Sequence, residues 1–210
     1  MYGFRKPFAA AAWTGDVELW GYTLGLKSTL IISQVLGYCL SKFIGIKVIS
    51  EMGGRNRNTA LLMLIGVAEL ALVGLALVPD AWRPICLFVN GLPLGMVWGL
   101  VFGSLEGRRL SEVLGAGLSA SYIVASGFVK TVGLWLMAAG VPMVWMPAVT
   151  GLCFSPLLVV SVWMLARLPP PSPEDEALRT RRAPMTGAAR RAFVRAYAPG
   201  LLPLTVLYIL

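Results

Sequence analysis

Five long apolar segments constrain what this chain can fold into. They cover residues 22–49, 59–78, 82–105, 114–140 and 144–166. A helix that crosses the hydrocarbon core of a bilayer needs about 20 apolar residues. All five segments reach that length, and their apolar residues come in runs without the polar alternation that gives a soluble helix its wet face. The sequence therefore predicts an all-α membrane protein whose first partner is the lipid bilayer.

The composition excludes several classes of function. Only 13% of the residues are charged, against about 25% in a soluble domain. The net charge of +8 comes from basic residues at the ends of apolar runs, so no nucleic acid partner is expected. There is no histidine, no paired cysteine motif and no phosphate-binding glycine loop. We therefore expect no enzyme activity, no cofactor and no metal.

Shorter apolar segments flank the five long ones and complete the predicted domain organisation. Residues 1–13 are too few to cross a bilayer, and we interpret them as the outer half of a truncated first helix. Residues 197–210 are interpreted as the start of a seventh helix. The predicted organisation is therefore a six-helix transmembrane bundle over residues 1–167, a polar linker over 168–196, and the beginning of a seventh helix over 197–210.

Basic residues predict how the chain is oriented. They concentrate in alternate connections, where they are Lys47, Arg55 and Arg57, then Arg108 and Arg109, and finally the arginines of the 168–196 linker. The connections between these hold few basic residues or none. Because basic connections stay in the cytoplasm, we expect a multi-pass protein of the inner (plasma) membrane with a cytoplasmic N-terminus and a cytoplasmic linker.

Six ionisable residues lie within the predicted spans, and four of them form the candidate site; the six are Arg5, Lys6, Lys27, Lys42, Glu69 and Lys130. Each costs a few kcal/mol at membrane depth unless it is paired or hydrated. Glu69 and Lys130 lie far from the ends of their segments, and Arg5 is eight residues before Trp13, which we expect at the outer interface, so it too is expected near mid-membrane. Lys42 is about five residues from an end, so its stem could carry the ammonium to the interface instead. No catalytic role is assigned to any of them.

The charge balance of this site predicts the ligand. One carboxylate among several cations leaves positive charge that a bound anion would compensate. We therefore expect Arg5, Lys42 and Lys130 to bind a small anionic substrate. Glu69 could carry a coupling proton or neutralise a lysine. The structural alternative is a set of buried pairs, such as Glu69 with Lys130.

Four glycines follow one another at intervals of four in the segment 82–105. They are Gly91, Gly95, Gly99 and Gly103. Residues spaced in this way lie along one broad helix face. Small residues let a neighbouring helix approach closely, which is how helices associate in lipid. The stripe predicts a tight helix contact.

Several short sequence segments resemble those of known membrane protein families. MYGFRKPF, SQVLGYCLSKFIGIKV and NGLPLGMVWGLVFGSLEGRR resemble an uncharacterised bacterial membrane family related to the major facilitator superfamily. More distantly, FRKPF and the group Tyr38, Ser41, Lys42, Phe43 and Ile44 are similar to the first two helices of the organophosphate:phosphate antiporters. The resemblance implies that Arg5 and Lys42 face a central site and hold a phosphate.

The same resemblance implies the architecture and the activity. It implies a major-facilitator-type protein of twelve helices in two halves, of which this chain holds the first half and a little of the second. The missing C-terminal half is then a partner of the bundle. The expected function is a secondary transporter that moves an organic or phosphorylated anion by alternating access. The alternative is a membrane scaffold or sensor that keeps such a bundle without transport.

Overall fold

The computed structural model describes residues 1–19, 21–51, 57–105, 111–169 and 187–209. Within this part of the chain, two compact units are distinguished, Met1–Thr180 and Arg181–Leu210. The first unit contains all the long apolar segments and is described first.

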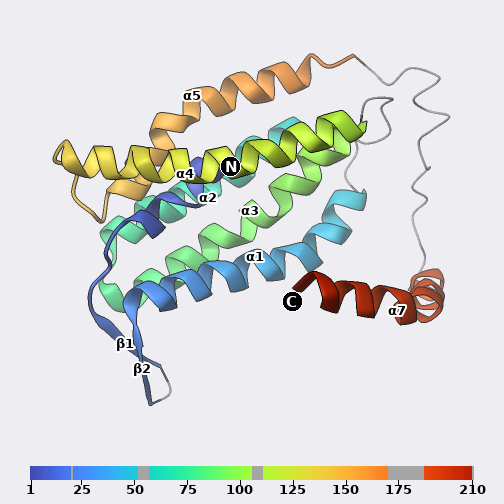
Figure 1. Cartoon of the computed structure of the whole chain (residues 1–210), viewed down its shortest axis with the longest axis horizontal. Coiled ribbons are helices and arrows are strands. Elements are labelled where there is room, and N and C mark those ends of the chain that lie inside the picture. Colours follow the sequence, from blue (N-terminus) through green and yellow to red (C-terminus); the bar gives the residue numbers. More distant parts are fainter. Residues whose placement is uncertain (20, 52–56, 106–110, 170–186, 210) are drawn as a thin grey trace. The chain divides into compact units, whose positions relative to one another are not determined.

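Five α-helices form the framework of the first unit (Figure 1). They are α1 (Leu26–Glu51), α2 (Arg57–Leu77), α3 (Arg83–Leu105), α4 (Ser111–Ala138) and α5 (Met146–Ala166). Each contains a stretch that is long and apolar enough to cross a membrane. The prediction of an all-α membrane protein is confirmed at this level.

The N-terminal segment differs from the expected half of a spanning α-helix. It forms two short 3-10 helices, η1 (Tyr2–Phe4) and η2 (Pro7–Ala10). Pro7 has no backbone N–H to donate, so it cannot continue the hydrogen bonds of η1 and instead begins η2 as its first residue. The chain therefore breaks between η1 and η2. The interpretation of residues 1–13 as a truncated α-helix is corrected to a pair of turns.

A β-hairpin lies between these turns and α1. It consists of β1 (Asp16–Leu19) and β2 (Tyr22–Gly25), which pair antiparallel with Asp16 opposite Gly25. Gly15 and Gly21 have positive φ angles of 113° and 80°, which glycine adopts at no steric cost. The predicted start of the helix at residue 22 is therefore wrong, and α1 begins at Leu26.

The contacts among these elements place the N-terminal turns inside the bundle. Helix α3 lies against both α1 and α2, and α2 also contacts α5. Both η1 and η2 contact α4 and α5, and η1 contacts α2 as well. The short N-terminal segment therefore lies among three spanning helices.

The contact between α1 and α3 depends on glycines. A Cβ atom added at Gly91 would collide with the carbonyl oxygen of Gln34 in α1. One added at Gly95 would overlap Ser41 Oγ and lie 2.7 Å from the carbonyl oxygen of Tyr38. At these two positions the predicted close approach of a helix is confirmed.

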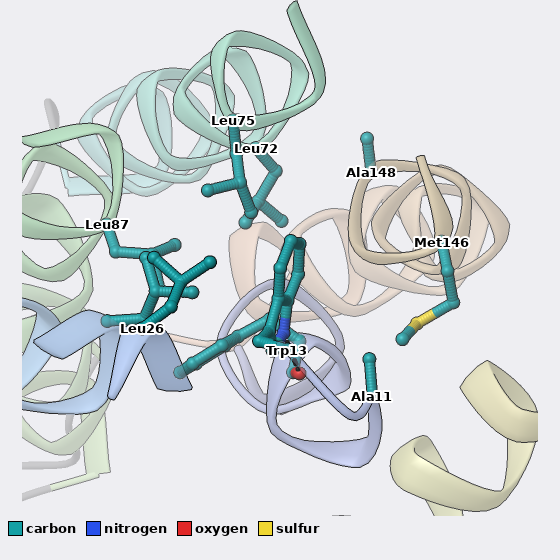
Figure 2. Close-up of a cluster of buried hydrophobic side chains, with 10 residues drawn as sticks. Ala11, Trp13, Leu26, Leu72, Leu75, Leu87, Met146 and Ala148 are labelled. Carbon is teal, nitrogen blue, oxygen red and sulfur yellow. Dashed lines mark hydrogen bonds between the residues drawn. The ribbon is translucent and has the colours of Figure 1, made fainter. Parts of the chain in front are cut away.

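Trp13 anchors the end of the N-terminal segment. Its side chain is only 5% exposed, so it is a core residue. Its Nε1 donates a hydrogen bond of 2.8 Å to the carbonyl oxygen of Phe8. Figure 2 shows its ring among Leu72 and Leu75 of α2, with Met146 of α5 nearby.

The second unit contains α7 (Gly187–Ile209). This helix begins ten residues before the segment 197–210 that we expected to start a seventh spanning helix. Arg191 and Arg195 lie in its first half, where both are exposed. Most of the predicted linker, residues 170–186, lies outside the described residues.

Candidate functional site

A buried network of two amides holds the N-terminal turn against three helices. Asn90 of α3 is fully buried. Its Nδ2 donates to the carbonyl oxygens of Phe4, at 3.1 Å, and Ala68, at 2.9 Å. Gln34 of α1 donates from Nε2 to Asn90 Oδ1, at 2.8 Å, and to the carbonyl oxygen of Arg5, at 3.1 Å. The peptide groups before and after Arg5 are therefore both held in place.

Arg5 projects from this anchored backbone toward α1. Its guanidinium carbon lies 4.1 Å from the centroid of the Tyr38 ring. A cation over an aromatic face is attracted by the negative face of the ring. The Nε atom of Arg5 is buried and has no hydrogen-bond partner within the described residues. One donor of the guanidinium is therefore left unsatisfied by the described residues.

Lys42 reaches the same aromatic ring from one turn further along α1. Its Nζ lies 4.9 Å from the centroid of Tyr38 and 5.6 Å from that of Trp98 in α3. The structure thus brings Arg5 and Lys42 together on Tyr38. We call Arg5, Lys42 and Tyr38 the cationic cluster.

Lys130 approaches from α4. The ammonium of Lys6 interacts electrostatically with the charges of both Arg5 and Lys130. Lys130 is itself half-buried. It is therefore near the N-terminal cations, although no direct contact joins it to Tyr38 in the part of the chain that the structure describes.

Glu69 lies apart from these cations. Its Oε2 atom is buried without a hydrogen-bond partner among the described residues. It points at α5, because a Cβ atom added at Gly151 would collide with Glu69 Oε2. The expected alternative, an ion pair between Glu69 and Lys130, is not formed within the described parts of the chain.

A cavity of about 600 Å³ opens beside the N-terminal turn. Its lining comes from η1 and from α2, α3, α4 and α5, and most of the lining side chains are apolar. Tyr2 and Tyr122, both in the lining, contact each other with ring centroids 5.5 Å apart. None of the four predicted site residues is among its lining residues.

Comparison with known proteins places the chain in a family. Residues 7–210 match a family described as a family of unknown function, DUF5690. The chain belongs to DUF5690. No curated protein and no solved structure matches it. These comparisons do not connect it with the major facilitator superfamily or with the antiporters, so both resemblances stay predictions.

The match covers most of the candidate site of this DUF5690 chain. It includes the five long helices and the residues Lys42, Glu69 and Lys130, and it begins two residues after Arg5. Sequence reasoning missed Tyr38 as the residue that joins the two cations. The available signal was its position four residues before Lys42, since residues four apart share a helix face.

Proposed function

We propose that this chain forms the N-terminal half of a secondary transporter that moves an organic or phosphorylated anion across the inner membrane by alternating access. The observation that supports it best is the convergence of Arg5 and Lys42 on Tyr38. Two cations beside one ring repel each other, and a bound anion relieves that repulsion.

Arg5 is the main ligand in this proposal. Its guanidinium offers a planar pair of donors that matches phosphate or carboxylate, whereas a lysine ammonium offers a point charge. Lys42 adds charge at the same ring, and Lys130 adds positive potential from α4. The anion enters because these cations are costly to keep in the membrane without a counter-charge.

Glu69 serves as the coupling group in this mechanism. Its unpartnered Oε2 atom lies between α2 and α5. A carboxylate without a cation partner gains from taking up a proton in an apolar environment. A cytoplasmic N-terminus and rocking of this bundle against the missing C-terminal half complete the proposed transport cycle.

One observation favours the alternative function, a scaffold or sensor. The cavity beside η1 is mainly apolar and contains none of Arg5, Lys42, Lys130 and Glu69. A protein that only packs against other membrane helices needs no hydrated path between these residues. Uptake of the anion across a membrane, which only a transporter would catalyse, therefore distinguishes the two functions.

Arg5→Lys is the decisive variant. A hydrogen bond to a charged group is worth about 1.5–3 kcal/mol. Loss of the second guanidinium donor should therefore weaken anion binding roughly 10- to 100-fold. The full-length protein in lipid nanodiscs would be titrated calorimetrically with inorganic phosphate and with succinate. Uptake of the bound anion into proteoliposomes would then be measured.

Lys27→Ala is the matched control. Lys27 is a half-buried cation in the first turn of α1, at the end of the helix opposite Lys42. It should bind and transport like the wild type. Equal binding by Arg5→Lys and wild type would refute the assignment of Arg5. Binding of neither anion by the wild type would favour the scaffold or sensor.

A further inference from the structure

The apolar cavity and the cationic cluster are neighbours. Trp98 connects them, because it lines the cavity and its ring centroid lies 5.6 Å from the Lys42 ammonium. Phe4 also lines the cavity, and Arg5 is the next residue. The positive charge therefore lies at the border of the cavity and not within it.

The cavity has the size and the lining of a ligand site. Its volume of about 600 Å³ falls within the range of roughly 300–1,000 Å³ of small-molecule pockets. Its polar side chains are few, among them Ser121, Ser161 and the tyrosines 2 and 122. An ordered water needs two to four polar partners. An apolar group fills most of this space better than water does.

We propose that the ligand is an amphipathic anion. Its phosphate or carboxylate head contacts Arg5 and Lys42, and its alkyl tail passes Trp98 into the cavity. This inference rests on the proposed anion function and names its substrate class. Trp98 is stacked on Phe102, with centroids 4.8 Å apart and planes within 7° of parallel. This stacking gives the tail a rigid aromatic edge at the entrance.

A chain-length series tests the inference. The full-length protein in lipid nanodiscs would be titrated with inorganic phosphate and with ethyl, butyl and hexyl phosphate, which stay soluble in water. A buried methylene is worth about 0.8 kcal/mol, so affinity should rise up to about fourfold per methylene. Hexanol supplies the same tail without a charge and should bind far more weakly than hexyl phosphate.

Ala125→Phe distinguishes binding of the alkyl tail from binding of the anionic head. Ala125 lines the cavity from α4, and a larger side chain there should fill it. This variant should bind inorganic phosphate like the wild type and lose the gain with chain length. Ala120→Phe, at an exposed position of the same helix outside the lining, is the control. The control should keep the rise in affinity with alkyl chain length.

The possible failures are distinguishable. Equal affinity for phosphate and hexyl phosphate overturns the amphipathic ligand and leaves the anion site standing. Equal affinity for hexanol and hexyl phosphate also overturns it, because the cavity then takes a lipid tail or a packing group independently of the cations. If no phosphate of the series binds, both this inference and the proposed anion function fail.

Discussion

Removing the Asn90 side chain should destabilise the bundle strongly. Asn90→Ala deletes three hydrogen bonds, two donated to the carbonyl oxygens of Phe4 and Ala68 and one accepted from Gln34. Such bonds average about 0.6 kcal/mol in a membrane protein and reach about 1.7 kcal/mol. The sum is about 2 kcal/mol at the average and about 5 at the upper end. We expect a loss of about 2–4 kcal/mol.

Two further variants isolate the hydrogen bonds from packing. Asn90→Leu keeps a side chain of similar size, so most of its cost comes from the lost hydrogen bonds. Val89→Ala changes the neighbouring residue, which is 38% exposed, and should cost no more than about 0.5 kcal/mol.

The assay is reversible unfolding of the full-length protein in mixed micelles, followed by tryptophan fluorescence as the fraction of denaturing detergent rises. Asn90→Ala and Asn90→Leu should both unfold well before wild type. If Asn90→Ala unfolds together with Val89→Ala, the amide network does not hold the turn and the argument for a fixed Arg5 backbone fails.

Two other predictions concern packing and topology. Gly95→Ala should cost about 1–3 kcal/mol through overpacking against Ser41. The same change at Gly66, which has nothing within 4 Å of an added Cβ, should be neutral or gain up to about 1 kcal/mol. Comparable losses at both sites in the same unfolding assay would contradict the close approach of α1 and α3. Separately, a cysteine placed at Asp80 and one placed at Arg167 should be labelled from opposite sides of the membrane, because α3, α4 and α5 lie between them. Labelling of both from the same side would contradict three membrane crossings.

The sequence predicted the framework well because the evidence for it is local. A run of about 20 apolar residues must form a helix in lipid, where every backbone group needs an internal partner. The N-terminal segment was harder, since its outcome depends on turn chemistry. Pro7 divides it into two turns, and the glycines at 15 and 21 allow a hairpin where the apolar pattern indicated a helix.

The candidate site was predictable only in part. The cost of charge in a membrane pointed to Arg5 and Lys42, and a family resemblance indicated that they share a site. The pairing of Gln34 with Asn90 joins residues 56 positions apart, which no local pattern reveals. The cavity was not foreseen, because its existence depends on which faces of four helices remain unfilled after packing.

The amide network has a consequence for how residue 5 tolerates change. Gln34 donates a hydrogen bond to the main-chain oxygen of Arg5, and Asn90 donates one to that of Phe4. Every amino acid has the same backbone carbonyl oxygen, so these hydrogen bonds do not depend on which side chain stands at position 5. A library of substitutions there should yield folded proteins that differ in what they bind. Selectivity at this position can therefore diverge, in nature or in the laboratory, without a compensating change in the scaffold.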